Sequence, residues 1–166
     1  MSAILAPYGR SGSTHDVDFD TTKPTMRTDE RKSHISHVVC DTGSWEQHVA
    51  ASLEQMPEVL AYVKNEGLGF YIPYVHDGEQ RNYMPDFICR VDDGRGAKDP
   101  LNLIVEVSGQ NLELKTVKVE TAETMWVPAV NHLEEFGRWA YVEIKDPWTT
   151  EQVVRAHLEA TMPLGV

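Results

Sequence analysis

The first long apolar pattern in the chain has the spacing of a helix. Between residues 45 and 63, large apolar side chains recur every three or four positions, which places them on one buried face of a helix. Ser44 and Gln47 match a capping box at the start of this segment. Pro57 is expected to kink or split the helix, and Gly67 to end it. The pattern therefore predicts a first helix that is interrupted at the proline.

Four later segments have the composition of β-strands. Each is rich in β-branched, aromatic or aliphatic residues and is bounded by polar stretches or by glycine and proline. The segments are residues 70–75, 82–91, 101–107 and 138–144. The Asp77-Gly78 pair predicts a hairpin turn between the first two segments. The run Leu103-Ile104-Val105 is typical of a central strand that is covered on both faces.

Two further helices complete the predicted order of elements. Residues 114–130 form the first, and a second capping box, Thr149 with Gln152, begins the last. The order α-β-β-β-α-β-α predicts an α/β fold, with a mixed four-stranded sheet flanked by helices.

The first 43 residues differ from the rest because they are rich in Ser, Thr, Asp and Gly. Residues 1–43 are expected to form an extended N-terminal arm or linker, with a candidate short strand at 33–40. Residues 44–166 are assigned to the folded domain.

Composition limits the class of protein. With 166 residues, 41% of them apolar, the chain has the size and core-forming capacity of one domain. No apolar run approaches the roughly 20 residues of a membrane span. No basic segment leads a long apolar one at the start, so a secretory signal is not expected. Cys40 and Cys89 lie far apart without a CxxC pattern, which favours a reduced, cytoplasmic protein.

The formal net charge of -11 argues against binding to nucleic acid or an anionic membrane by bulk charge alone. The acid excess is concentrated in residues 45–112, with five basic and eleven acidic side chains. Metal-dependent nuclease sites are themselves built from carboxylates, so this acidity does not exclude a nuclease. There is no GxxxxGK[ST] phosphate loop, and therefore no recognisable ATPase motor.

Two of these acids are expected to meet. Asp86 lies on the second predicted strand and Glu106 interrupts the apolar third strand, so the two carboxylates can converge at one edge of the sheet. Converging carboxylates favour a cation between them. Mg²⁺ suits such a place because it takes oxygen ligands and keeps waters, and it can polarise a scissile phosphate. The alternative interpretation is a structural acid that is paired with a lysine or with backbone groups.

Longer blocks of sequence accompany these two acids. They are Thr21-Thr22-Lys23-Pro24, Ser36-His37-Val38-Val39, Asp41-Thr42-Gly43-Ser44-Trp45-Glu46-Gln47, Ala61-Tyr62-Val63-Lys64-Asn65, Pro85-Asp86-Phe87-Ile88, Leu101 to Gly109, Trp126-Val127-Pro128-Ala129-Val130-Asn131 and Gly137-Arg138-Trp139-Ala140. From about Thr21 to Leu158 the chain resembles the C-terminal endonuclease region of type III restriction enzyme Res subunits. These belong to the PD-(D/E)xK nuclease superfamily.

The resemblance implies an αβββαβ restriction-endonuclease-like core that hydrolyses phosphodiester bonds of double-stranded DNA with Mg²⁺, or alternatively Mn²⁺. Asp86 and Glu106 would be catalytic metal ligands, without a covalent intermediate. The implied partners are an ATP-dependent helicase-like translocase and a modification (methyltransferase) subunit. The translocase is missing from this sequence, so we expect a stand-alone fragment, a truncated product or a subunit that meets its motor in trans.

One position departs from the family motif. Ser108 stands where the ExK lysine would orient the attacking water and offset charge on the phosphorane. In this superfamily the lysine can move to the following helix, where Lys118 is favoured over Lys115 as the catalytic cation. Gln110 is a weaker substitute. Without such a lysine, the alternative is a catalytically impaired or inactive module of the same fold that docks a partner or contacts DNA.

The first helix offers a further acid, since members of the superfamily often present a glutamate from it to the metal. Glu46 and Glu54 are the two candidates here. An alternative role for Glu46 is to stabilise the helix N-terminus. A second rival, an acidic protein-interaction domain, would place Asp86 and Glu106 more than roughly 8 Å apart, too far to share one ion.

Overall fold

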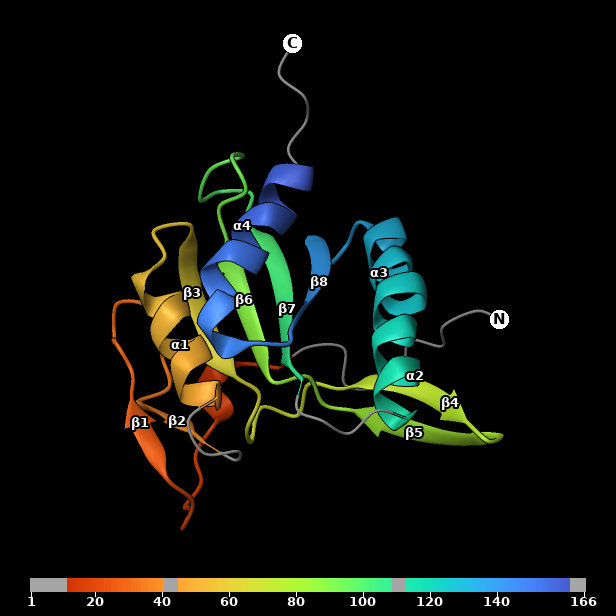
Figure 1. Cartoon of the computed structure of the whole chain (residues 1–166), viewed down its shortest axis with the longest axis horizontal. Helices are drawn as coiled ribbons and strands as arrows, with labels where there is room; N and C mark the ends of the chain where they lie inside the picture. The colour runs from red at the N-terminus through yellow and green to blue at the C-terminus, as the bar shows by residue number, and fades with distance from the viewer. Residues whose placement is uncertain (1–11, 41–44, 109–112, 162–166) are drawn as a thin grey trace.

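The computed structural model describes residues 12–40, 45–108 and 113–161. A mixed four-stranded sheet lies at the centre, in the spatial order β3-β6-β7-β8 (Figure 1). Its strands are β3 (Val59–Lys64), β6 (Phe87–Val91), β7 (Leu101–Val107) and β8 (Arg138–Ile144). Strand β6 runs antiparallel to both β3 and β7, whereas β7 and β8 are parallel. The protein is therefore an α/β fold with a mixed sheet.

Helices cover both faces of this sheet. The helical elements are η1 (Thr14–Asp16), α1 (Trp45–Gln55), α2 (Glu113–Thr121), the π-helical η2 (Ala122–Trp126), α3 (Val127–Leu133), η3 (Pro147–Thr149) and α4 (Thr150–Thr161). Leu103 and Val105 of β7 pack in a cluster with α1 and α4. Ile104, between them, packs on the other face against η2 and α3. Because neighbouring side chains of a strand point to opposite faces, β7 is covered on both sides.

Two short hairpins complete the fold: β1 (Thr25–Arg27) with β2 (His37–Val39), and β4 (Ile72–His76) with β5 (Glu79–Tyr83). The second hairpin turns through Asp77 and Gly78, whose φ angles are 51° and 76°. Two consecutive positive φ angles are the mark of a type I′ turn, for which Asp-Gly is a preferred pair. The predicted hairpin turn is therefore present.

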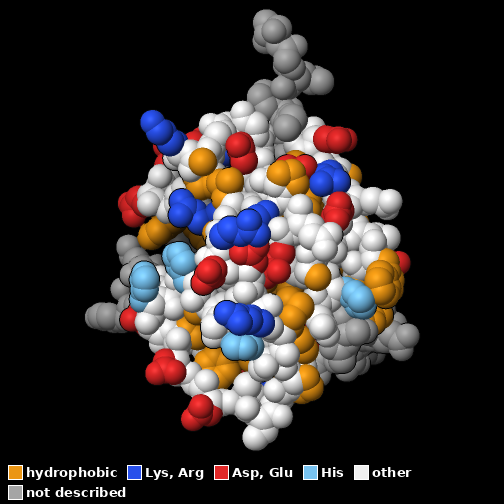
Figure 2. All heavy atoms as spheres, turned by 90° about the vertical axis from the view of Figure 1, so that its left-hand side faces the viewer, with side chains coloured by type: hydrophobic (Ala, Val, Ile, Leu, Met, Phe, Trp, Pro, Cys, Tyr) orange, Lys and Arg blue, Asp and Glu red, His pale blue; other side chains and the backbone are white. Residues whose placement is uncertain are grey.

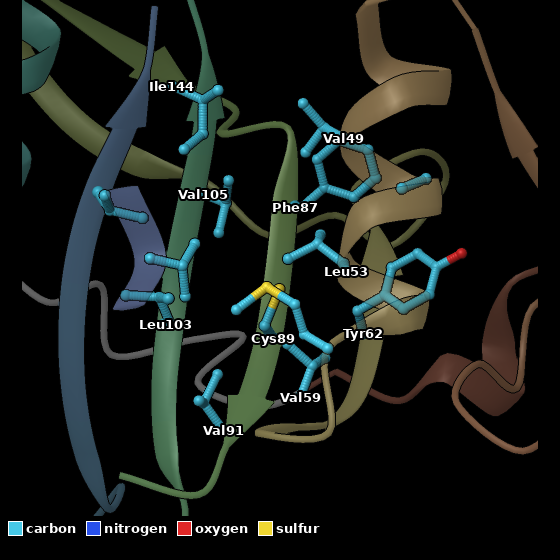
Figure 3. Close-up of a cluster of buried hydrophobic side chains, with 14 of the residues drawn as sticks. Val49, Leu53, Val59, Tyr62, Phe87, Cys89, Val91, Leu103, Val105 and Ile144 are labelled. Atoms are coloured by element: carbon cyan, nitrogen blue, oxygen red, sulfur yellow. The ribbon is translucent and has the colours of Figure 1, made fainter. Parts of the chain in front are cut away.

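The larger core lies between the sheet and the helices α1 and α4. Val49 and Leu53 of α1 point toward Phe87, Cys89 and the strands beyond (Figure 3). All of these side chains are fully buried. Their burial attaches α1 to the middle of the sheet.

The second core, on the opposite face, is largely aromatic. Phe70 stacks on Trp139 with ring centroids 5.7 Å apart, and both rings meet Trp126 edge-on at 5.6 and 5.2 Å. Such offset and edge-to-face arrangements are the preferred ones for aromatic rings. They hold the helical segment 113–133 and the β4-β5 hairpin onto this face.

The predicted first helix was too long. It ends at Gln55, before Pro57, and residues 59–64 form strand β3 instead. A register shift between Val59 and Ala61 marks a bulge, in which two residues of β3 oppose one of β6. The bulge breaks the strict alternation of buried and exposed residues in β3. The buried residues of this strand are therefore spaced as in a helix, which explains the wrong prediction.

The predicted strand 82–91 is in fact two strands. Strand β5 ends at Tyr83 and β6 begins at Phe87, with Met84, Pro85 and Asp86 between them. Pro85 has no backbone N–H, so the hydrogen-bonded ladder cannot run through it. As a result, the segment predicted as the first sheet strand, 70–75, pairs only in the β4-β5 hairpin, and β3 takes its place in the main sheet.

Other elements agree with the sequence patterns. Strands β7 and β8 have the predicted bounds, and the predicted helix 114–130 lies within the continuous segment α2-η2-α3. The last helix begins differently: Asp146, rather than Thr149, accepts a hydrogen bond from the backbone amide of Trp148 and caps the η3 turn before α4. Ser44 of the first predicted capping box lies outside the described residues.

The described part of the N-terminal segment packs on the domain. Val38 and Cys40 belong to the same buried cluster as Leu53. The backbone carbonyl of Lys32 accepts a hydrogen bond of 2.8 Å from the amide of Tyr62. Strand β2 lies within the segment 33–40 expected to form a short strand, whereas β1 was not predicted.

Leu53→Ala is expected to lower the free energy of unfolding by about 2–5 kcal/mol, because the change leaves a cavity between α1 and the sheet. Val75→Ala, at a position 57% exposed on the β4-β5 hairpin, should change it by less than about 0.5 kcal/mol. Chemical denaturation of both variants measures the difference. Equal effects would contradict the placement of α1 against the sheet.

Candidate functional site

The two predicted metal-binding carboxylates meet at one end of the sheet. Asp86 immediately precedes β6 and Glu106 lies near the end of β7, and Phe87 pairs with Val105 in the ladder between them. The backbone amide of Asp86 donates to Glu106 Oε2 at 3.3 Å. Asp86 Oδ2 in turn accepts a hydrogen bond of 2.8 Å from the backbone amide of Val107. The pairing of two strands therefore brings both acids together at the same strand ends.

A buried lysine adjoins this pair from the other neighbouring strand. Lys64, the last residue of β3, lies opposite Phe87 in the register. Its Nζ donates to Asp86 Oδ1 at 2.9 Å, and only 6% of the side chain is exposed. The Asn65 amide donates to the Asp86 carbonyl at 2.8 Å and fixes the backbone here. Lys64 was not predicted as a site residue, because the apolar spacing of its segment indicated a helix.

Glu106 lies in an environment that favours its neutral form. Burial and the negative charge of Asp86 raise the pKa of the Glu106 carboxyl to about 8, and a hydrogen bond with Tyr83 opposes this only partly. The Tyr83 and Tyr141 hydroxyls lie 3.1 Å apart, and burial raises the pKa of both phenols. The tyrosines are therefore neutral hydrogen-bonding groups beside the acid. A cation bound beside Asp86 and Glu106 would favour the charged form of Glu106 and lower its pKa.

Of the lysines expected on the following helix, Lys118 faces this site. Its Nζ lies 5.6 Å from the centre of the Tyr83 ring. Its positive charge acts to lower the pKa of Glu106. Lys115 falls in α2, but its side chain lies outside the described part of the structure, as does the whole of Gln110. Helix α2 therefore brings at least one cation into electrostatic range of the carboxylates.

Ser108, which replaces the motif lysine, is held by the neighbouring strand. Its backbone amide donates to the carbonyl of Ile144 at 2.9 Å, and its hydroxyl lies 3.4 Å from the same oxygen. The residue is buried. Its hydroxyl is thus directed to β8 as part of the packing of the strand end.

Glu46 occupies the first turn of α1 and is almost fully buried. Figure 3 shows Val49, the next residue on this helix face, beside Phe87, which directly follows Asp86. The first turn of α1 therefore lies toward the same end of the sheet as the carboxylate pair. Glu46 nevertheless does not belong to a group of three or more metal-ligating side chains among the described residues.

Glu54 has a structural role at the other end of α1. Its Oε1 accepts hydrogen bonds from the hydroxyl of Tyr62 at 2.6 Å and from the backbone amide of Asp29 at 2.7 Å. It therefore attaches the N-terminal segment to β3. Across all described residues, no group of three or more His, Cys, Asp or Glu side chains is arranged to hold a metal ion.

The surface charge is mixed on the side of the molecule that carries α1 and β3. Figure 2 shows Lys and Arg side chains lying among Asp and Glu side chains over this face. The net negative charge of the chain does not form one continuous acidic surface there. Repulsion of a nucleic acid by this face would accordingly be weaker than the net charge alone suggests.

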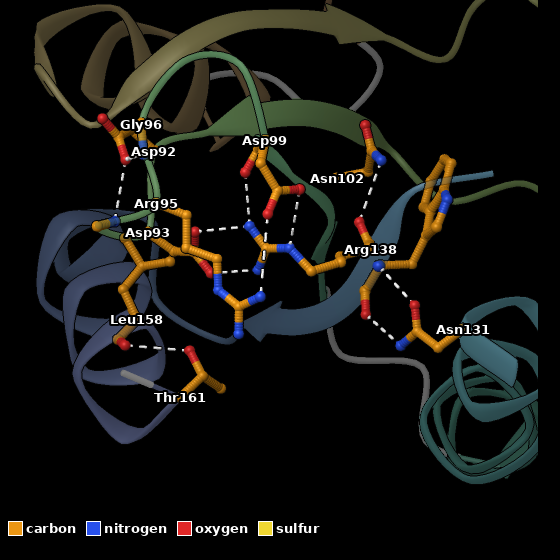
Figure 4. A network of polar contacts seen from close by, with 12 residues as sticks. Asp92, Asp93, Arg95, Gly96, Asp99, Asn102, Asn131, Arg138, Leu158 and Thr161 are labelled. Atoms are coloured by element: carbon orange, nitrogen blue, oxygen red, sulfur yellow. Dashed lines mark hydrogen bonds and ion pairs between the residues drawn. The ribbon is translucent and has the colours of Figure 1, made fainter. Parts of the chain in front are cut away.

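A second polar network lies at the opposite end of the sheet, where β8 begins. Arg138 makes two hydrogen bonds with Asp93, of 2.5 and 2.8 Å, and a further one of 3.2 Å with Asp99 (Figure 4). The guanidinium lowers the pKa of the Asp93 carboxyl. These bonds fasten the 92–100 loop to β8, and the shallow depression beside them is remote from the carboxylate pair. We therefore assign this network to structure.

Comparisons of the chain with protein-family models, with curated proteins and with solved structures gave no match. None of the helices in the described ranges is long and apolar enough to span a membrane.

The raised pKa of Glu106 makes stability depend on pH. The folded protein retains this proton up to about pH 8, whereas the unfolded chain loses it near 4.5. Since the folded state binds more protons between these values, the free energy of unfolding should fall as the pH rises from about 5 to about 8. Glu106→Gln removes this contribution, so the variant should gain stability relative to the wild type over that range.

Denaturant titrations across this pH range measure the effect, with the exposed Glu159→Gln on α4 as the matched control. An identical pH dependence in the wild type and Glu106→Gln would contradict the environment described for Glu106.

Proposed function

We propose that this chain is a metal-dependent DNA endonuclease domain of the PD-(D/E)xK superfamily, of the kind found in type III restriction systems. The observation that carries the proposal is the pair Asp86 and Glu106 at the ends of adjacent strands, where the backbone amide of Asp86 donates a hydrogen bond to the carboxylate of Glu106. One of them is buried strongly enough to favour its neutral form in the absence of a cation.

The order of the elements supports the proposal. The connection α1-β3-β6-β7-α2-β8, with two antiparallel pairs followed by a parallel one, is an αβββαβ arrangement with the β4-β5 hairpin as an insertion. In the family that the sequence resembles, the metal-binding acids are expected on the second and third strands of such a core. Glu106 lies on the third strand and Asp86 immediately precedes the second, which agrees with the proposal.

The donor set of the pair fits Mg²⁺. This ion prefers oxygen ligands and is commonly held by one or two carboxylates, with its other positions filled by water and phosphate oxygens. Asp86 and Glu106 would hold it. When bound, the ion would supply Lewis-acid polarisation of the scissile phosphate and a more acidic attacking water.

The residues of the chain have separate tasks in the proposed hydrolysis. The Val107 amide orients the carboxylate of Asp86, and Tyr83 orients that of Glu106. Lys118 would offset the negative charge that develops on the phosphorane, the role of the lysine missing at Ser108. Water attacks phosphorus while the bond to the leaving oxygen breaks, and no covalent intermediate forms with the protein.

The proposed partners follow from the resemblance and from the charge. Phosphate binding normally depends on lysine and arginine, and the chain carries a net charge of -11. Firm binding of double-stranded DNA would therefore depend on the metal and on a basic partner. The translocase and the modification subunit of a type III system are the proposed partners.

A nicking assay tests the function. With Mg²⁺ or Mn²⁺, the wild-type protein is expected to nick supercoiled plasmid, and Asp86→Asn and Glu106→Gln should each lower the rate by roughly a hundredfold or more. Lys118→Met should lower it by roughly tenfold. Glu159→Gln, an exposed change remote from the pair, is the control and should retain the wild-type rate.

Nicking that persists in both Asp86→Asn and Glu106→Gln would contradict the proposed site. The burial of Ser108 favours a second candidate function, a catalytically inactive module of the same fold that contacts DNA or a partner. That candidate predicts Asp86-dependent metal binding without any nicking, also when the translocase is supplied.

A further inference from the structure

Three neighbouring strands bring charged groups together at one end of the sheet. Lys64 comes from β3, Asp86 precedes β6, and Glu106 comes from β7, and these strands are neighbours in that order. The ammonium of Lys64 contacts the carboxylate that any ion at the pair would also contact. A cation is therefore already built into the site by the fold.

We infer that Lys64 is a resident counter-ion of Asp86 that competes with the divalent cation and so sets the concentration at which the site takes up metal. The inference rests on the proposed function, because it assigns a regulation to the same pair. Lys64 is a positioning residue in this scheme, since it acts through Asp86.

Both oxygens of Asp86 are already engaged. Lys64 Nζ binds Oδ1 at 2.9 Å, and the Val107 amide binds Oδ2 at 2.8 Å. A metal ion on this carboxylate must share Oδ1 with the ammonium or displace it. Because the amide is part of the backbone of β7 and the ammonium ends a long side chain, Lys64 is the partner that can move.

Burial makes this competition strong. The Lys64 side chain is 6% exposed and that of Asp86 is 20% exposed, so water screens their charges much less than it would at the surface. The same low screening applies to the repulsion between the ammonium and an incoming divalent cation. Removing the positive charge while retaining the carboxylates should therefore strengthen metal binding.

If Lys64 had only a structural role, its loss would change the metal affinity in the opposite direction. Lys64 joins β3 to the start of β6, and its ammonium also lies 5.4 Å from the centre of the Phe87 ring. If its only task were to hold these strands, its loss would loosen Asp86 and weaken metal binding. The direction of the change in metal affinity thus separates the two roles.

The test is a calorimetric titration of Mn²⁺, without DNA, into the wild-type protein and into two variants that lack the charge. Lys64→Gln keeps a hydrogen-bond donor, and Lys64→Met keeps the length of the side chain. Both are expected to bind Mn²⁺ roughly tenfold more tightly than the wild type. Lys64→Arg keeps the charge and should bind as the wild type does.

Lys98→Met is the matched control, because it removes one positive charge from the exposed 92–100 loop, away from the pair. It should leave the Mn²⁺ affinity unchanged. Thermal melting of each variant establishes that it is folded, and Lys64→Gln serves if Lys64→Met does not fold. In the wild-type protein, Mg²⁺ should shift the side-chain ¹⁵N resonance of Lys64 and leave that of Lys98 in place.

Equal or weaker Mn²⁺ binding by folded Lys64→Gln would overturn the inference, as would an unmoved Lys64 resonance on saturation with Mg²⁺. Failure of the proposed function has a different signature. In that case the wild-type protein binds no Mn²⁺, or Asp86→Asn binds it as well as the wild type does.

Discussion

The antiparallel pairing of β6 with β7 is the constraint on which the candidate site depends. It sets Phe87 opposite Val105, and this register leaves Asp86 and Glu106 as the next pair at the strand ends. A slip by one residue would turn every side chain of one strand to the opposite face. Such a slip would expose the core residues Phe87 and Val105 together with the site. Core packing and site geometry are therefore fixed by the same register.

The same pairing concentrates negative charge where little water can screen it. Asp86 has an ion pair with Lys64 and a backbone amide bond, whereas Glu106 has hydrogen bonds with Tyr83 and the Asp86 amide and the more distant charge of Lys118. Burial and the negative charge of Asp86 outweigh these contacts and raise the pKa of Glu106 to about 8. Asp86 thus has a cationic partner within the fold, whereas Glu106 lies where an added cation would favour its charged form.

The sequence predicted the strands whose signals are local. Strands β7 and β8 are continuous apolar runs, and their bounds follow from the pattern. Strand β3 was predicted as helix because its bulge disturbs the alternation of apolar residues. Strands β5 and β6 were predicted as one strand because an apolar run continues after Pro85. With β3 misassigned, Lys64 could not be placed beside Asp86. Glu106 could be singled out because it interrupts an apolar strand. The role of Lys64 as a partner of Asp86, by contrast, is recognisable only from the pairing of strands.

The concentration of acids between residues 45 and 112 is only a weak indication of where a metal site lies. Glu54 bonds to Tyr62, Glu58 to Arg155 and Asp93 to Arg138, so several of these acids hold the fold together. What distinguishes Asp86 and Glu106 is that they are adjacent to each other as well as to cations. Charge excess in a segment therefore indicates where acids are, but only the pairing of strands decides which of them share a site.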